Sequence, residues 1–159
     1  PTLTFSNDDN AIGFGTLSSG SVKYANAGAT GSGTRTTAHT LVIGTNAPTG
    51  YSLTYNGATL TSGANTIPGA DINADADGTI GTSQFALAGT ETGGGAMSAD
   101  YDAATPNWDF VASTVTTIAS ASSATSSSSI AMEYLANTSS AQAAGTYVTT
   151  LDYVATGNF

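Results

Sequence analysis

One acidic segment of the sequence has the residue types and spacing of a calcium-binding loop. Counted from Asn73, oxygen-bearing side chains fall at the first, third and fifth positions, and Gly78 follows at the sixth, where such a loop turns sharply. The candidate ligands are Asn73, Asp75, Asp77, Thr79 through its carbonyl oxygen, and Gln84. Gln84 stands where a glutamate normally supplies two oxygens, so we expect weak Ca²⁺ binding. The alternative is a solvated acidic loop that holds no ion.

A second group of residues combines aromatic rings with a carboxylate. Tyr101 and Asp102 lie shortly before Trp108, and rings that stack on sugar faces beside carboxylates that accept hydroxyl hydrogen bonds are typical of glycan contacts. The alternative, which we favour, is a tryptophan that packs a loop onto the domain. The carboxylates do not define a glycoside hydrolase, because sequence spacing does not fix the separation that hydrolysis requires.

No set of residues indicates catalysis. His39 is the only histidine, so any serine-based triad would depend on it, and no Gly-x-Ser-x-Gly sequence is present. The glycine run that begins at Gly93 lacks the lysine and the helix of a phosphate-binding loop. The chain has no cysteine, which excludes disulfides, thiol catalysis and cysteine-bound metals. We therefore expect a protein that is not an enzyme.

The charge pattern excludes two classes of partner. The 159 residues include 2 basic and 11 acidic side chains, which gives a net charge of −9. Nucleic acids and anionic membrane surfaces are both bound through cationic side chains, which are nearly absent here. No apolar run is long enough to cross a membrane. Because no signal-like segment is visible either, we expect any targeting segment to have been removed.

Alternation with a period of two residues predicts the elements that position these groups. We expect strands over residues 22–24, 36–43, 51–55, 84–88, 108–111, 115–118, 130–135 and 146–154. Asn56 and Gly57 predict a tight hairpin turn. Residues 61–83 are expected to be mainly polar loop, and residues 119–129 either a loop or a polar edge. This pattern indicates an all-β fold. We expect one β-sandwich or jelly-roll domain over residues 1–159, built of short antiparallel strands with long polar loops.

The N-terminal arm, residues 1–6, is the candidate assembly element. Leu3 and Phe5 alternate with polar residues, and a turn-like segment over residues 7–10 separates the arm from the next apolar residues. One interpretation is donor-strand complementation, in which the arm pairs with a neighbouring subunit and the two apolar side chains fill a groove there. The other is an ordinary first strand of the chain's own sandwich.

Several segments spread over the chain carry a likeness to known proteins. They are Ile12 to Leu17, Ala38 to Leu41, Thr45 to Tyr51, Tyr134 to Asn137, and the ending from Ala144 to Phe159. Together they resemble secreted proteins of ultrasmall bacteria of the candidate-phyla type (Patescibacteria). More loosely, the chain is similar to β-sandwich subunits of bacterial and archaeal filaments that assemble by strand exchange. The resemblance implies a protein of the cell surface.

These observations favour a structural role outside the cell. We expect a subunit of an extracellular, pilus-like filament or cell-surface array, in which copies of the chain bind one another by β-strand addition. The expected partner is the chain itself, with no nucleic acid and no membrane insertion. The alternative is a monomeric carbohydrate-binding or adhesin module, with Trp108, Tyr101 and Asp102 as glycan contacts.

Overall fold

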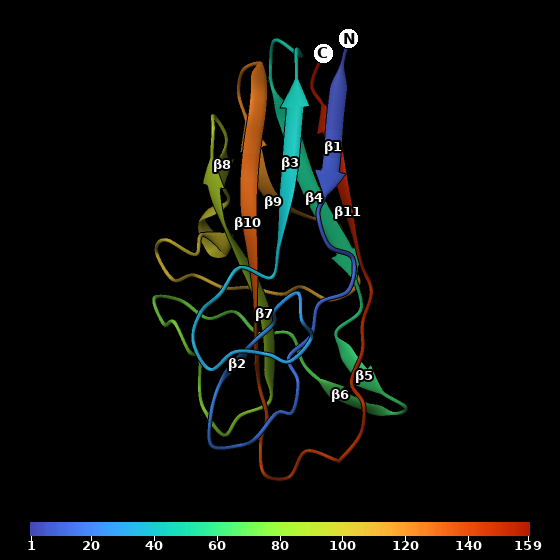
Figure 1. Ribbon diagram of the computed structural model, residues 1–159, viewed down its shortest axis with the longest axis vertical. Coiled ribbons are helices and arrows are strands. Elements are labelled where there is room, and N and C mark those ends of the chain that lie inside the picture. The colour runs from blue at the N-terminus through green and yellow to red at the C-terminus, as the bar shows by residue number, and fades with distance from the viewer.

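The computed structural model describes residues 1–159, and it consists of two facing antiparallel sheets with loops below them (Figure 1). The first sheet contains β1 (Leu3–Asn7), β3 (His39–Thr45), β10 (Thr125–Asn137), β7 (Gln84–Thr92) and β2 (Lys23–Tyr24). The second sheet contains β11 (Leu151–Gly157), β4 (Tyr51–Gly57), β9 (Thr116–Ala121) and β8 (Ala96–Met97). The remaining elements are the hairpin of β5 (Leu60–Ser62) and β6 (Asn65–Ile67), and the 3₁₀ helix η1 (Ala99–Tyr101). The expected all-β sandwich is therefore confirmed.

The long strand β10 organises the first sheet. Its first part pairs with β3, its second part pairs with β7 on the opposite edge, and its last residues also pair with β2. The structure contains no helix of the length and hydrophobicity that a membrane span requires.

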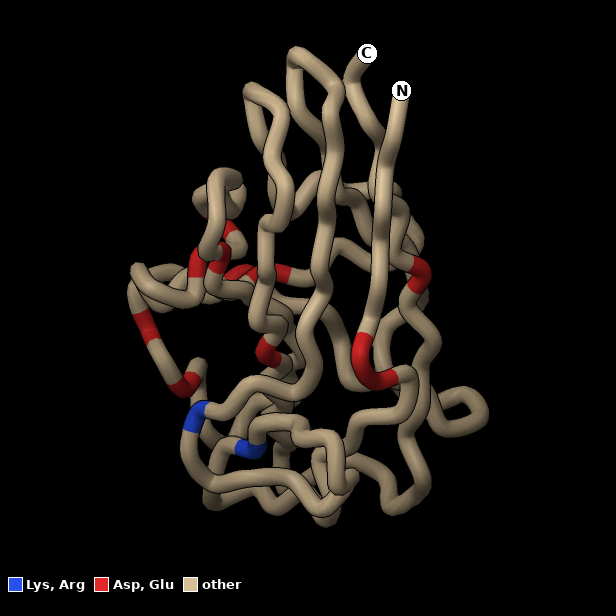
Figure 2. Tube along the Cα trace, turned by 45° about the horizontal axis from the view of Figure 1, so that its top comes forward, with Lys and Arg blue, Asp and Glu red and all other residues tan.

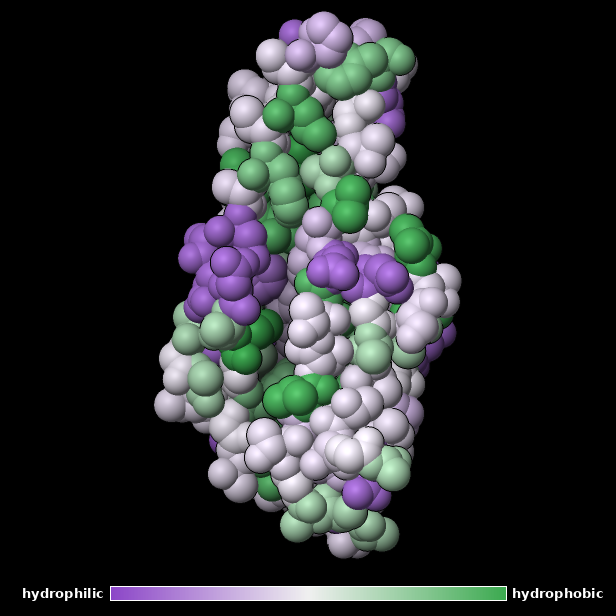
Figure 3. Space-filling model, turned by 90° about the vertical axis from the view of Figure 1, so that its right-hand side faces the viewer, coloured by the Kyte–Doolittle hydropathy of each residue, from purple (hydrophilic) through white to green (hydrophobic).

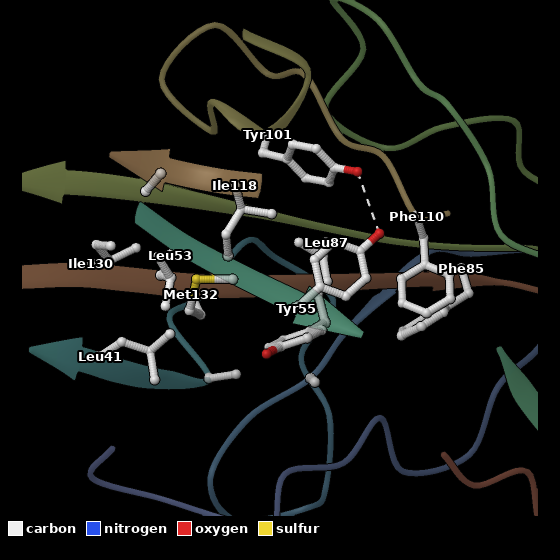
Figure 4. Packing of buried hydrophobic residues seen from close by; sticks show 14 of the residues in the cluster. Leu41, Leu53, Tyr55, Phe85, Leu87, Tyr101, Phe110, Ile118, Ile130 and Met132 are labelled. Carbon is white, nitrogen blue, oxygen red and sulfur yellow. Dashed lines mark hydrogen bonds between the residues drawn. The ribbon is translucent and has the colours of Figure 1, made fainter. Parts of the chain in front are cut away.

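The main core lies between the two sheets and follows the alternation of the strands. On β4, for example, Tyr51, Leu53 and Tyr55 are fully buried, whereas the intervening residues are partly exposed. They meet the inward residues of β3, β7 and β10 in one cluster (Figure 4). Truncating such a side chain, as in Leu53→Ala, costs about 2–5 kcal/mol of stability, because it leaves a cavity that the rigid sheets fill only in part.

A second, smaller core covers the outer face of the first sheet. On β7, Phe85 and Leu87 face the main core, whereas Ala86 and Ala88 face this second cluster, so the strand is buried on both faces. The loops that cover β7 bring Trp108 onto this face, where it is fully buried. The sequence of β7 is therefore a continuous apolar run because both faces of the strand are buried.

Some of the local predictions are wrong. Residues 108–111 do not form the expected strand, because only Trp108 and Asp109 pair, each through an isolated bridge. Asn56 and Gly57 do not form a hairpin turn, because they pair within the sheet with Asp152 and Leu151 of β11. The expected polar loops also contain strands: the β5–β6 hairpin lies within residues 60–67, and the serine-rich tract forms the end of β9 and the start of β10. The turn before β4 is confirmed. There Gly50 has a φ of 77°, and a Cβ would lie 2.0 Å from the carbonyl oxygen of Ala121, so only glycine fits.

Candidate functional site: the open side of the sandwich

The two sheets are not closed on the side where β1 and β11 lie. β1 is the last strand of the first sheet and β11 the last strand of the second, so each has a partner on one side only. Both strands run along the same side of the molecule, and both chain ends lie at its upper end (Figure 1). We call this surface the open side. The opposite edge of the first sheet is different, because residues around Gly69, Asp102 and Asp109 form bridges to β7.

The predicted assembly residues lie on the open side and point towards the gap between the sheets. Leu3 stands opposite Thr45, and Phe5 opposite Ile43, whose side chain is fully buried. Directly opposed residues of an antiparallel pair share a face, so Phe5 faces the interior as Ile43 does. The side chains of Leu3 and Phe5 nevertheless remain 37% and 39% exposed. They face inward without being fully covered.

The backbone of β1 also has unused hydrogen-bonding groups on this side. Bonds to β3 are made at Thr2, which accepts from Asn46, and at Asp8, which donates to Thr40. Bonded and non-bonded pairs alternate along an antiparallel ladder, so the even-numbered residues of β1 bond to β3. The N–H and C=O groups of Leu3 and Phe5 therefore point away from β3, towards the open side.

Exposed hydrophobic side chains gather on this side. Of the eight large hydrophobic residues that are exposed, five belong to β1, to β11 or to the residues flanking β11: Leu3, Phe5, Val148, Val154 and Phe159. Figure 3 shows hydrophobic side chains over the upper half of this face, above hydrophilic patches. Exposed apolar side chains gathered on one side of a molecule are typical of interaction sites.

A chain of hydrogen bonds crosses from one sheet to the other at the lower end of β1. His39 Nδ1 lies 2.7 Å from Asn7 Oδ1, and His39 Nε2 lies 2.6 Å from the Tyr134 hydroxyl. The Tyr134 hydroxyl in turn bonds to the hydroxyl of Tyr153 on β11. Asn7 Oδ1 also accepts a hydrogen bond from the N–H of Asp9, so the atom of Asn7 that faces His39 is the carbonyl oxygen, an acceptor. His39 Nδ1 must then carry the proton, and Nε2 accepts from Tyr134.

This chain favours a neutral histidine. Burial lowers the pKa of His39, and the nearby carboxylates of Asp8 and Asp9 oppose that effect only in part. Burial also raises the pKa values of Tyr134 and Tyr153, so both hydroxyls stay protonated. The structure gives this histidine a definite role, because its hydrogen bonds link β1, β3, β10 and β11.

The acidic loop turns as the calcium pattern predicts, and its oxygens are bonded to groups of the protein. Gly78 has the positive φ of 62° that the sharp turn needs. Asp75 Oδ1 accepts the N–H of Asp77, while Asp77 Oδ1 accepts from the Tyr24 hydroxyl at 2.6 Å. Gln84 Oε1 accepts the N–H of Thr79 at 2.8 Å, and the Asn73 side chain donates to Asp71. No group of three or more metal-binding side chains converges there. Calcium binding stays a prediction.

The predicted glycan contacts are in the wrong place for a sugar. Trp108 is fully buried and Tyr101 is 3% exposed, so neither ring offers a face to a ligand. The Tyr101 hydroxyl donates to Asp109 and bonds to Tyr55 in the core (Figure 4). Asp102 accepts the N–H of Ala104 within its own turn. The favoured alternative, a tryptophan that packs a loop onto the sandwich, describes the structure correctly.

Sequence reasoning missed the ion pair that holds this second core together. Arg35 Nε donates to Glu133 at 3.0 Å, its Nη2 donates to the Ala103 carbonyl at 2.8 Å, and its guanidinium lies 5.2 Å from the centre of the Trp108 ring. Both basic residues of the chain lie away from the open side (Figure 2). The sequence did hold a signal for this ion pair: Arg35 is one of only two basic residues in the chain, which singles it out for attention.

Comparison with known proteins finds no match: no family model, no curated protein and no solved structure matches this chain.

Proposed function

We propose that the chain is a structural subunit of an extracellular homopolymer, a filament or a surface array, in which copies are joined by β-strand addition at the open side. The exchanged element is the N-terminal arm, which leaves its place beside β3 and fills the same place in the next copy. The role is structural and not catalytic. A head-to-tail exchange of this kind grows open ended.

The state of β1 is the observation that carries this proposal. It is the most exposed strand of the first sheet: four of its five residues are exposed, and only Asn7 is partly buried. Its side chains Leu3 and Phe5 face the core side while remaining more than a third exposed. A strand that gives up little burial on leaving, and that has a defined register to return to, is suited to exchange between copies.

The free energy gained by exchange is small, so the ionic strength of the solution should determine how far the chain assembles. Exchange alone leaves the contacts of the arm unchanged, because the arm fills the same place in the next copy. Any gain must come from the contact between neighbouring copies. Full burial of a leucine or phenylalanine contributes about 1.5–3 kcal/mol, so covering there the third of Leu3 and Phe5 that stays exposed would add roughly 0.5–1 kcal/mol each. Against this, every copy carries a net charge of −9. Salt screens such repulsion over about 8–10 Å at physiological ionic strength. We expect assembly to increase with ionic strength.

A disulfide lock tests the exchange directly, since the chain has no cysteine of its own. Leu3 and Thr45 are directly opposed and belong to a non-hydrogen-bonded pair, where the Cα atoms lie about 4.5 Å apart and a disulfide fits. In the variant Leu3→Cys/Thr45→Cys, oxidation ties the arm to its own β3. We expect the oxidised form to stay monomeric and the reduced form to polymerise, as seen by light scattering and negative-stain microscopy.

Matched controls separate the arm from the rest of the surface. Thr2→Asn/Thr4→Asn changes the outward face of the arm and should leave assembly intact, whereas Leu3→Asn/Phe5→Asn should abolish it. If the oxidised lock polymerises like the reduced form, the arm is not the exchanged element. If the unmodified chain stays monomeric at every salt concentration, the homopolymer itself is wrong.

A further inference from the structure

Below the hydrogen-bonded chain of His39, the open side deepens into a groove with a volume of about 930 Å³. One wall is formed by residues 9–19 and the other by residues 138–151, and the floor reaches buried side chains of β6 and β7. Its volume lies at the upper end of the range of about 300–1,000 Å³ that ligand pockets occupy. We call it the lower groove.

Each wall is braced from behind. In the first wall, Gly13 exchanges two backbone hydrogen bonds with Asn26, and Phe14 packs edge-on against Phe85 at 6.2 Å. In the second wall, Val148 exchanges two backbone bonds with Thr61 of β5. No hydrogen bond joins one wall directly to the other. The groove is therefore held open by its own supports, which is the state of a largely pre-formed binding site.

The lining is almost without charge. Asp9 is the only Asp, Glu, Lys or Arg among the lining residues, and burial lowers the pKa of His39, so the histidine is neutral at pH 7. A phosphate or carboxylate ligand would find no cation here, and an unpaired charge is costly to bring out of water. The lining instead combines apolar residues with hydroxyl and amide groups. The lower half of this face is mostly of intermediate hydropathy (Figure 3).

One aromatic ring in the groove is held rigidly and remains partly exposed. The Tyr147 hydroxyl donates to the Ala143 carbonyl at 2.7 Å and accepts from Gln142 Nε2 at 2.7 Å. Gln142 is itself fixed, because its side chain donates to the Thr66 carbonyl and accepts from Ser83. A ring fixed at its hydroxyl end keeps its faces in place, and an immobile platform loses little entropy when a ligand stacks on it.

We propose that the lower groove binds a neutral oligosaccharide, with the ring of Tyr147 as its stacking surface. Such a ligand matches both the apolar and the polar part of the lining. The faces of its sugar rings carry C–H groups that pack on apolar and aromatic side chains. The edges carry hydroxyls that bond to Ser, Thr and amide groups. The site is separate from the Leu3 and Phe5 contacts and does not depend on the proposed assembly. It also does not include Trp108, which is buried in the second core on the other face of β7.

Calorimetric titration of the full chain, with the arm locked by the Leu3–Thr45 disulfide to keep it monomeric, tests this site. The neutral probes are maltotriose, cellotriose and chitotriose, and the contrasting probes are an anionic sialyl-trisaccharide and a fatty acid. We expect at least one neutral probe to bind with a Kd of about 1 mM or tighter. Tyr147→Ala should weaken that binding about tenfold or more, consistent with the loss of a stacking contact.

Two variants separate stacking from a structural role of Tyr147. Tyr147→Phe keeps the stacking ring and removes the hydroxyl that fixes it, so its affinity should fall clearly less than that of Tyr147→Ala. Val115→Ser changes an exposed residue outside the groove and should have no effect. The proposal is wrong if no neutral probe binds, if an anionic or fatty-acid probe binds as tightly, if Tyr147→Ala binds like the parent, or if Tyr147→Phe loses as much affinity as Tyr147→Ala.

Discussion

Replacing Tyr134 with phenylalanine should cost more stability than replacing Tyr153, although both remove one hydroxyl from the same chain. The Tyr134 hydroxyl stands in the middle: it bonds to His39 Nε2 and to Tyr153. His39 is only 5% exposed, so Tyr134→Phe leaves its ring nitrogen without a partner. A buried group left unsatisfied costs about 1–3 kcal/mol. We expect a loss of about 2 kcal/mol, which for a domain of this size lowers Tm by about 4–8 °C.

Tyr153→Phe removes the outer member of the chain and leaves Tyr134 free to keep donating to His39. After this change the Tyr134 hydroxyl still bonds to His39 Nε2, so no buried group is left without any hydrogen-bond partner. The cost of Tyr153→Phe should stay below about 1 kcal/mol. Thermal unfolding followed by circular dichroism at pH 8 measures both variants. An equal or larger loss for Tyr153→Phe, or no loss for Tyr134→Phe, would refute the assigned direction of the hydrogen bonds.

Three further predictions concern His39, the acidic loop and Trp108. Burial lowers the pKa of His39 in the folded chain below 6.5. As the pH falls, His39 is therefore protonated in the unfolded chain at a higher pH than in the folded chain. Stability measured by urea unfolding should therefore be level from pH 8 to 7 and fall as the pH drops below about 6.5, and His39→Gln should remove that fall. Calcium titration should show weak binding, with a Kd of about 0.1–1 mM, because the ion must compete with Tyr24 for the Asp77 carboxylate. Asp77→Asn should abolish the binding heat. If the unmodified chain gives no heat and no thermal shift, there is no calcium site. Trp108 fluorescence should be blue-shifted, resistant to acrylamide and unchanged by saccharides, since the ring is fully buried, and ready quenching would contradict its placement.

Local alternation was enough to predict the fold class and most strands of the core. Tyr51, Leu53 and Tyr55 alternate with polar residues and lie on the inward face of β4 as expected. The pairing partners were not predictable from such patterns. Asn56 and Gly57 have the local preference for a hairpin, yet pairing with β11, far along the chain, determines their conformation. Tertiary pairing overrides a local turn preference when it adds a whole edge of hydrogen bonds.

The candidate sites show the same division between local and long-range information. The serine tract was expected to be a loop or a polar edge, but Ser128 is buried because its hydroxyl bonds to Tyr51 and to Glu91 on two other strands. Trp108 was named as a ligand contact from its neighbours in sequence, whereas its burial arises from Arg35 and from the loops over β7. Leu3 and Phe5 were identified by local alternation. Their incomplete burial depends on β11, which the arm alone does not reveal.

The order of the strands along the chain has a consequence for how the molecule reaches its native state. β3 pairs with β10, and β4 pairs with β11, so each sheet joins an early strand to a late one. Contacts so far apart in sequence make folding slow. A chain that emerges from its N-terminus cannot complete the first sheet before β10 (Thr125–Asn137) is free, nor the second before β11 (Leu151–Gly157) is free. Neither sheet can therefore close until most of the chain has been synthesised, and the sandwich forms as one of the last events of folding.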